Sequence, residues 1–184
     1  MNVVIFHGSH GSPDGNWFPW LKQKLEELDI STDVPRLPTP ENQSPETWFE
    51  AINNITINEY SVVIGHSTGA NFLLHLLEKN TVAKAIFVGV VIGKLDLPEY
   101  DALNKPFLKT PGFDWSKISE NAGEIHILHG DNDPYVDQVH SEFLQNQIGG
   151  DLQIIPGGGH LNAESGYDTF ELGLKLIVER EYHA

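Results

Sequence analysis

Short apolar runs alternate along the chain with longer segments in which apolar residues recur at helical spacing. Such runs are typical of buried strands, and a spacing of three to four residues is typical of helices that pack one face on a sheet. We expect strands at residues 3–7, 32–37, 61–64, 85–92, 125–129 and 152–155. We expect helices at residues 17–28, 44–52, 70–79 and 169–180. Six short strands with helices between them predict an α/β fold, with a mainly parallel, doubly wound sheet flanked by helices.

Three segments add local detail to this pattern. Ser44 and Pro45 have the form of a helix N-cap followed by proline at the first helical position. Residues 70–79 are apolar nearly all round, so we expect this helix to be buried against the sheet. Residues 93–123 form the longest irregular stretch, which we expect to be a short cap or an excursion at the rim. The sequence contains no repeat or linker, so we expect one domain over residues 1–184.

The composition is globular, with 40% hydrophobic and 20% charged residues. A net charge of −15 disfavours nucleic acid and anionic membranes as partners, because both require clustered Lys and Arg. The absence of cysteine excludes disulfides, a cysteine nucleophile and cysteine-bound zinc. The apolar run at the amino terminus is too short for a signal peptide or a membrane span. We therefore expect a cytoplasmic protein whose partner is a small molecule, and no protein partner is indicated.

The expected strand at residues 61–64 is followed directly by the pentapeptide GHSTG at residues 65–69 and then by an expected helix. This is the pattern G-x-S-x-G, the nucleophile elbow, which exposes a serine on a sharp strand-to-helix turn. Small residues stand two before and two after that serine because neighbouring backbone passes close by. Ser67 is therefore the candidate nucleophile.

A serine hydroxyl needs a base to take its proton, and the base needs an orienting acid. The candidate base is His160, in the glycine-rich loop after the last expected strand. The candidate acid is Asp133, in the loop after the strand before it. The chain order Ser, Asp, His is that of the α/β-hydrolases. Since all three residues follow strands, we expect them at the carboxyl edge of the sheet.

Two other aspartates compete for the role of the acid. Asp131 directly follows the strand and has the character of a loop residue that bonds its own backbone. Asp137 is a weaker option, with the character of a charge at a helix N-terminus. Asp133 fits the hydrolase spacing G-x-x-D-x-x-V, which runs here from Gly130 to Val136.

An oxyanion hole needs two preorganised backbone N–H donors. One is expected at Thr68, directly after the nucleophile. The other is expected in the loop after the first strand, at Ser9, with His10 as the second choice. Residues 14–16 extend this loop and are candidates to line the mouth of the site.

The remaining histidines have mainly structural interpretations. His10 and His66 are possible substrate-lining residues, although His66 is expected to be packed or hydrogen-bonded rather than catalytic. His75 lies on the buried helix and is expected to have a local partner. His126 and His129 are three residues apart in a strand, so they face opposite sides of the sheet and cannot share a metal. We expect no metal and no cofactor.

With these residues in place, the sequence resembles the small serine-hydrolase family of the α/β-hydrolase superfamily, which includes retinoblastoma-binding protein 9 and bacterial YdeN-like hydrolases. The resemblance covers nearly the whole chain. Besides the opening strand and its glycine loop, it is carried by residues 16–21 (NWFPWL), 65–70 (GHSTGA), 113–118 (FDWSKI), 131–134 (DNDP) and 159–162 (GHLN). It implies a minimal α/β-hydrolase fold without a large lid, and Ser67, Asp133 and His160 as the catalytic triad. Binding to a retinoblastoma-type pocket does not carry over, because its L-x-C-x-E motif needs a cysteine.

These residues indicate a serine hydrolase that acts through an acyl-enzyme, most simply a carboxylesterase on small acyl esters. Amidase, peptidase and thioesterase activities are neighbouring possibilities that only the pocket can decide. The alternative is a binding protein that keeps the fold and uses the pocket without turnover, since a fold does not fix a function.

Overall fold

The computed structural model describes residues 1–109 and 112–179, and within them six strands form one sheet in the order β2-β1-β3-β4-β5-β6. All five neighbouring pairs are parallel. The strands are β1 (Asn2–Phe6), β2 (Ser31–Asp33), β3 (Val62–His66), β4 (Lys84–Val88), β5 (Glu124–Gly130) and β6 (Asp151–Ile155). The direction of strand addition reverses between β1 and β3. In a sheet of this type, ligands bind outside the carboxyl ends of the strands at that reversal.

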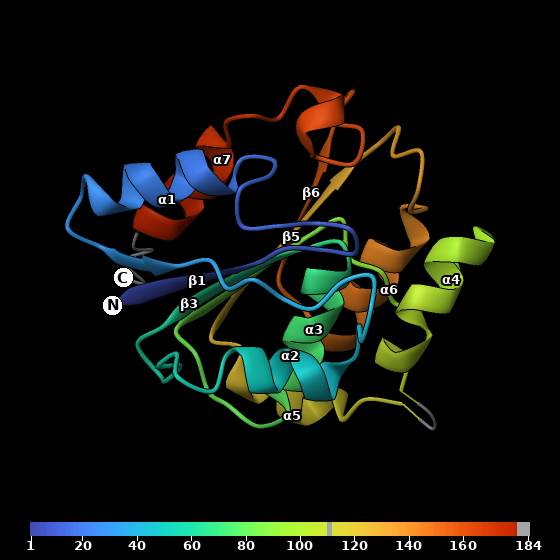
Figure 1. Ribbon diagram of the computed structural model, residues 1–184, viewed down its shortest axis with the longest axis horizontal. Helices are drawn as coiled ribbons and strands as arrows, with labels where there is room; N and C mark the ends of the chain where they lie inside the picture. Colours follow the sequence, from blue (N-terminus) through green and yellow to red (C-terminus); the bar gives the residue numbers. More distant parts are fainter. Residues whose placement is uncertain (110–111, 180–184) are drawn as a thin grey trace.

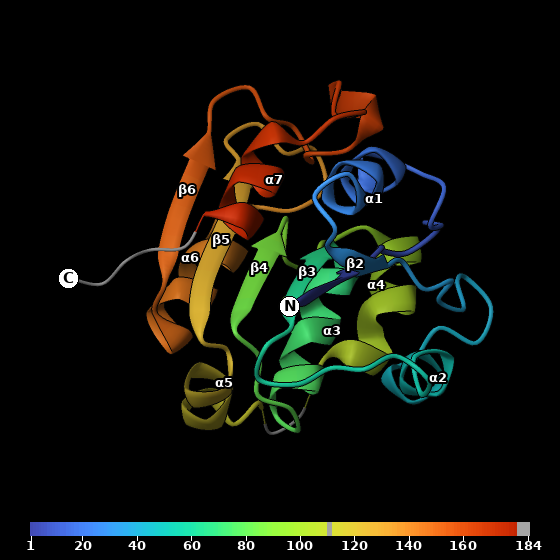
Figure 2. The same cartoon turned by 90° about the vertical axis from the view of Figure 1, so that its left-hand side faces the viewer.

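Helices cover both faces of the sheet. The helices of the described residues are α1 (Phe18–Glu26), α2 (Pro45–Ala51), α3 (Thr68–Leu77), α4 (Pro98–Asn104), α5 (Trp115–Asn121), α6 (Val139–Ile148) and α7 (Glu171–Val178). Two 3-10 turns, η1 (Lys105–Phe107) and η2 (Ala163–Ser165), accompany them. Helices α1 and α7 lie on one face, and α2, α3, α5 and α6 lie on the other (Figures 1 and 2). The expected α/β fold with a parallel, doubly wound sheet is therefore confirmed.

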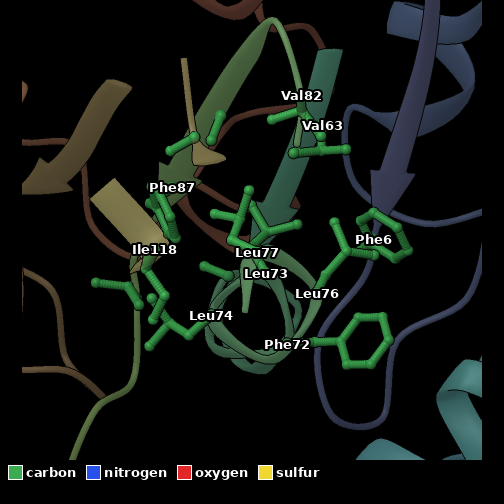
Figure 3. Packing of buried hydrophobic residues seen from close by; sticks show 14 of the residues in the cluster. Phe6, Val63, Phe72, Leu73, Leu74, Leu76, Leu77, Val82, Phe87 and Ile118 are labelled. Carbon is green, nitrogen blue, oxygen red and sulfur yellow. The ribbon is translucent and has the colours of Figure 1, made fainter. Parts of the chain in front are cut away.

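Two apolar cores follow from the alternation of side chains along the strands. Val3 and Ile5 of β1 face α1 and α7, whereas Val4 and Phe6 face α3. Figure 3 shows the core that contains Phe6, in which Ile118 of α5 lies beside α3, close to Leu74 and to Phe87 of β4. Nine of the ten residues of α3 are buried, as its apolar pattern predicts. The helix that begins directly after Ser67 is therefore held on every side, and its first turn has a fixed position.

The expected start of α2 is also confirmed. The Ser44 hydroxyl accepts a hydrogen bond from the Thr47 N–H at 3.3 Å, and Pro45 occupies the first helical position. Proline is tolerated there because that N–H has no partner inside the helix.

The interpretation of residues 93–123 as one irregular stretch is wrong. Its described part contains α4, η1 and α5. Both helices have only seven residues, so they are too short to show a clear helical period between the flanking prolines and glycines. Pro98 stands in the first turn of α4, and the Asp114 side chain caps α5 by accepting from the Lys117 N–H at 3.1 Å. Helix α4 lies beyond the carboxyl ends of the strands, at the right of Figure 1, so this segment does reach the rim.

The strand expected at residues 32–37 is shorter than its pattern indicates, because β2 ends at Asp33. Pro35 follows closely and has no N–H for a ladder hydrogen bond. No helix of the described residues combines the length and the apolar character needed to cross a membrane.

Candidate active site

The turn between β3 and α3 presents Ser67 in a strained backbone conformation. Its φ of 58° and ψ of −121° lie outside the regions that residues with a Cβ ordinarily occupy. The turn is anchored by the Ser67 N–H, which donates to the Val88 carbonyl at 2.8 Å. A Cβ at Gly65 would collide with the backbone of Gly69, and a Cβ at Gly69 would collide with the backbone at the end of β1. The two glycines of the elbow are therefore required by close backbone packing, as the sequence pattern indicates.

The loops after β5 and β6 bring Asp133 and His160 together. The Nδ1 of His160 lies 2.7 Å from Oδ2 of Asp133, and the side chains are 9% and 1% exposed, respectively. The other carboxylate oxygen, Oδ1, accepts from the N–H groups of Tyr135 at 2.8 Å and Val136 at 3.0 Å. Since a carboxylate only accepts, Nδ1 of His160 carries the proton and Nε2 is left as the acceptor. This is the tautomer that a general base requires.

The electrostatics of this pair favour the charged carboxylate. Burial by itself raises the pKa of Asp133. The hydrogen bond and charge of His160, together with the two backbone donors, lower the pKa by more than burial raises it. The net result is an Asp133 pKa below its ordinary value. Asp133 therefore stays ionised near neutral pH and can stabilise an imidazolium at His160.

The competing aspartates lie elsewhere. Asp131 is exposed, and its Oδ1 accepts from the Gly157 N–H at 2.7 Å, so it ties the β5 loop to the β6 loop. The expectation that Asp131 bonds its own backbone is wrong, because its partner is a residue of the neighbouring loop. Asp137 accepts from the Val139 N–H at 2.9 Å, at the start of α6, which is the place its helix-charge interpretation requires.

Ser67 and His160 line one cavity of about 280 Å³ at the carboxyl edge of the sheet. Gly8 closes this cavity on the β1 side, since a Cβ added there would lie 2.9 Å from Cβ of Ser67. Within the described residues the Ser67 hydroxyl makes no hydrogen bond of its own. Hydrogen bonds between a nucleophile and its base are often long in a protein without substrate and shorten when substrate binds.

In the described turns and loops, the backbone N–H groups of Ser9 and Thr68 have no acceptor. The N–H of His10, the second choice from the sequence, donates instead to the Thr39 hydroxyl at 2.8 Å. Among the loop residues considered, Ser9 is thus the one whose N–H is free to receive an oxyanion together with that of Thr68.

The side chains of these two residues belong to one partly buried chain of hydrogen bonds. The Gln43 amide donates to Oγ of Ser9 at 2.8 Å, and Oγ of Ser9 lies 2.9 Å from Oγ1 of Thr68. The Thr68 hydroxyl donates onward to Oδ1 of Asn104 at 2.6 Å. At the other end, the Thr39 hydroxyl donates to Oε1 of Gln43 at 2.5 Å. Gln43 and Asn104 are 7% and 2% exposed, whereas Ser9 lines the cavity, so the network runs from the cavity wall into the buried interior.

The sequence gives no sign of Gln43 and Asn104 at this site. Gln43 lies in the loop before α2, and Asn104 ends α4, in a segment whose sequence pattern indicates no helix. Their roles depend on how distant loops pack, which periodicity does not report.

His66 and His10 both line the cavity, as expected. His66 is fully enclosed, and its Nε2 lies 2.8 Å from the carbonyl oxygen of His160, to which it donates. Burial and the neighbouring His160 lower the pKa of His66 to about 3, so its ring is neutral and supports the loop of the base. His10 lies at the mouth, with Nε2 3.2 Å from the Glu99 carboxylate.

The mouth of the cavity carries three side chains that the sequence did not single out as site residues. Tyr100 comes from α4, Tyr135 from the loop after β5, and Glu164 from η2. The Tyr135 hydroxyl donates to Oε2 of Glu164 at 2.8 Å, and this hydrogen bond raises the pKa of Tyr135. Of the expected mouth segment at residues 14–16, Gly15 and Asn16 line the cavity.

The other histidines have structural partners. His75 lies 2.9 Å from the Phe107 carbonyl, which is the local partner expected for it. His126 contacts Glu124 at 2.6 Å, whereas His129 contacts Ser141 of α6 at 2.9 Å on the opposite face. The prediction that these two residues face opposite sides is confirmed. Within residues 1–109 and 112–179, no three His, Asp or Glu side chains are grouped as metal ligands.

Comparison with known proteins places this geometry in a family. The model of the serine hydrolase family matches residues 3–179. YdeN of Bacillus subtilis (strain 168) is 26% identical over 180 residues, which cover 96% of this chain and 94% of that protein. The serine hydrolase RBBP9 of Rattus norvegicus is 22% identical over 162 residues, which cover 86% of each. The crystal structure of the B. subtilis ydeN gene product superposes with a TM-score of 0.87, at 26% identity and 96% coverage of both chains. The chain therefore belongs to the serine hydrolase family, with a compact α/β-hydrolase fold that has no large lid.

Proposed function

We propose that this protein is a carboxylesterase that hydrolyses small acyl esters through an acyl-enzyme intermediate. The observation that carries the proposal is the 2.7 Å contact between His160 and Asp133 at the edge of a cavity that also holds Ser67 on a strained turn. Membership of the serine hydrolase family supports the reaction class. Family membership does not specify the bond that is cleaved, so the ester bond and the small acyl group are what we propose.

In the first half of the reaction, Ser67 Oγ attacks the ester carbonyl while His160 Nε2 takes its proton. The carbonyl oxygen becomes an oxyanion and receives the N–H groups of Ser9 and Thr68. His160, now an imidazolium, is stabilised by the ionised Asp133. It then protonates the departing alcohol oxygen as the tetrahedral intermediate collapses to the Ser67 acyl ester.

In the second half, water takes the place of the alcohol. His160 Nε2 removes a proton from the water as its oxygen attacks the acyl carbonyl, and the same two N–H groups receive the second oxyanion. Collapse of this intermediate releases the carboxylic acid and returns the proton to Ser67 Oγ. All groups needed for both halves come from the loops after β1, β3, β5 and β6.

The size of the cavity supports small substrates. At about 280 Å³ it lies at the lower limit of ordinary ligand pockets, so it has room for a short acyl group and a compact alcohol. Leu95 and Phe18 supply apolar surface within it.

The experiment is hydrolysis of p-nitrophenyl esters from acetate to octanoate by the parent and by Ser67→Ala. We expect turnover by the parent, fastest for the short esters, and loss of nearly all turnover in the variant. A fluorophosphonate probe is run in parallel and is expected to label the parent at Ser67. A parent that neither hydrolyses the series nor reacts with the probe refutes the esterase and favours a pocket that binds without turnover.

A further inference from the structure

The residues that line the cavity carry negative charge without a compensating Lys or Arg. None of the described residues that line it is Lys or Arg, and Glu164 is the one carboxylate among them. His10 also lines the cavity, but its ring nitrogen contacts the Glu99 carboxylate at 3.2 Å, so any positive charge there is already paired. The whole chain carries a formal charge of −15, which adds a long-range field of the same sign. An anionic substrate therefore has no counter-charge in this cavity, whereas a cationic one has Glu164.

Two aromatic rings lie on the same side as that carboxylate. The ring centroid of Tyr135 is 5.2 Å from that of His160 and 5.8 Å from that of Tyr100. The Tyr135 hydroxyl holds the Glu164 carboxylate at 2.8 Å, which fixes the carboxylate beside the rings. Tyrosine rings with a nearby carboxylate form the environment that binds ammonium groups, because the ring face and the carboxylate both attract positive charge.

The position of Tyr100, Tyr135 and Glu164 in the cavity decides which part of the substrate they contact. In the proposed esterase reaction His160 protonates the alcohol oxygen, so the alcohol must leave from the side of the cavity where His160 stands. Tyr135 lies directly beside His160 on that side. The alcohol portion, rather than the acyl portion, therefore lies against Tyr135, Tyr100 and Glu164.

We propose that the preferred substrates are esters of amino alcohols, with a cationic ammonium group in the alcohol portion held by Tyr100, Tyr135 and Glu164. This inference rests on the proposed esterase function and adds a substrate class to it. Cation–aromatic contacts and one exposed carboxylate together give a preference of about tenfold over a neutral substrate of the same shape.

The test compares two esters of one acid that differ only in charge. Choline butyrate has a quaternary nitrogen where 3,3-dimethylbutyl butyrate has a carbon atom. The ratio of their kcat/KM values is measured for the parent, for Glu164→Gln and for Tyr100→Leu. The control is Glu120→Gln, which removes the same single charge from an exposed position on α5, the helix that leads into the amino end of β5 and not its carboxyl end.

We expect the parent and Glu120→Gln to prefer the choline ester by about tenfold, and Glu164→Gln and Tyr100→Leu to bring the ratio close to one. Because the preference is electrostatic, it should also shrink as salt is raised from about 0.05 M to about 0.5 M. A parent ratio of one or less, or a ratio that Glu164→Gln leaves unchanged, overturns the proposal.

Binding to the Ser67→Ala variant separates this inference from the esterase proposal. The Kd of each ester is measured by calorimetry, with no turnover required. Tighter binding of the choline ester supports the cation site even if the parent hydrolyses neither compound, in which case the esterase proposal alone fails. Equal or weaker binding of the choline ester refutes the cation site, whatever the parent does with p-nitrophenyl esters.

Discussion

The hydroxyl of Ser9 lies 2.9 Å from the hydroxyl of Thr68, although 59 residues separate them in the chain. Their N–H groups are the two donors that we assign to the oxyanion hole, and their side chains are joined to each other before any substrate arrives. The spacing of the donors is thus set by a hydrogen bond within the protein. Preorganisation of this kind lets a donor pair favour the transition state without reorganising during the reaction.

Removal of the Thr68 hydroxyl should therefore slow turnover more than it weakens binding. Thr68→Val keeps the shape of the side chain but leaves Ser9 and Asn104 without their shared partner. We expect kcat for p-nitrophenyl acetate to fall about tenfold with little change in KM, and Thr68→Ser to restore most of the rate. Steady-state kinetics of the two variants check this. Equal kcat values for Thr68→Val and the parent show that the network does not position the donors.

Asn104 should act through the same contact. Asn104→Ala alone is expected to lower kcat about as much as Thr68→Val. The double variant should be little worse than either single one, because both remove the same hydrogen bond. The coupling is read from the four kcat values of the cycle. Fully additive losses indicate that Asn104 acts independently of Thr68.

The two aspartates of the β5 loop provide a matched pair. In Asp133→Asn the amide oxygen stays on the Tyr135 and Val136 N–H groups and the NH2 faces Nδ1 of His160, which favours the wrong tautomer, so we expect kcat to fall by about 10⁴ with the fold retained. Asp131→Asn keeps an oxygen that can accept from Gly157, and kcat should stay within about threefold of the parent. Kinetics with p-nitrophenyl acetate distinguish them, with circular dichroism as the control for folding. The reverse order of effects reassigns the acid to Asp131.

His66 should make the stability depend on pH. Its pKa is about 3 in the folded chain against an ordinary value of 6.5, so between these pH values the unfolded chain binds the extra proton and the folded chain does not. The unfolding free energy therefore falls as pH drops below about 6.5, by about 1.4 kcal/mol per pH unit for one such group. Burial also lowers the pKa values of His7, His75, His129 and His140, which act in the same direction.

Urea unfolding at pH 7.5, 6.5 and 5.5 measures this dependence. We expect the unfolding free energy of His66→Gln to fall less steeply with falling pH than that of the parent. The difference in slope should be at most that of one proton, about 1.4 kcal/mol per pH unit. The slope is the readout, so a uniform loss of stability in the variant does not affect the test. Parallel pH curves for the two proteins exclude His66 as a contributor.

Close packing at the elbow predicts a large cost for one methyl group. In Gly69→Ala the new Cβ meets the carbonyl groups at the end of β1, which cannot move without disturbing the sheet. We expect a loss of about 3 kcal/mol in unfolding free energy. Gly93→Ala is the control, since its Cβ meets only the His140 ring, at 3.5 Å. Urea midpoints compare the two variants, and similar stabilities contradict the packing argument.

The sequence predicted those parts of the fold that depend on local pattern. A strand such as β3 is apolar on both faces because helices cover both sides of the sheet, and this composition is visible in the chain. The order of the chemical residues along the chain, together with parallel strands, placed the loops of Ser67, Asp133 and His160 at one edge. The sequence was less informative about which side chains contact each other. Asp131 and Asp133 are two residues apart, and their different partners depend on how the β6 loop packs.

The parts that the sequence did not reveal depend on tertiary contacts. Helix α4 has two turns, and its one buried residue is the polar Asn104, so no apolar stripe marks it. Gln43 lies in a polar loop where a buried amide is indistinguishable from a solvated one. Glu164 and Tyr135 are 29 residues apart and meet only because the β5 and β6 loops adjoin.

Helix α4 contributes one residue to the cavity mouth and another to the hydrogen bonds behind the oxyanion donors. Tyr100 faces the cavity mouth, while Asn104, one helical turn later, is buried in the hydrogen-bond chain behind the donors. Tyr135 and Glu164, by contrast, stand on the loops after β5 and β6, and their side chains take no part in that chain of hydrogen bonds. Mutation of the Glu164 side chain can therefore change which alcohol is accepted and leave the hydrogen bonds behind the oxyanion donors intact. Such an arrangement allows substrate preference to change without any change in the catalytic residues.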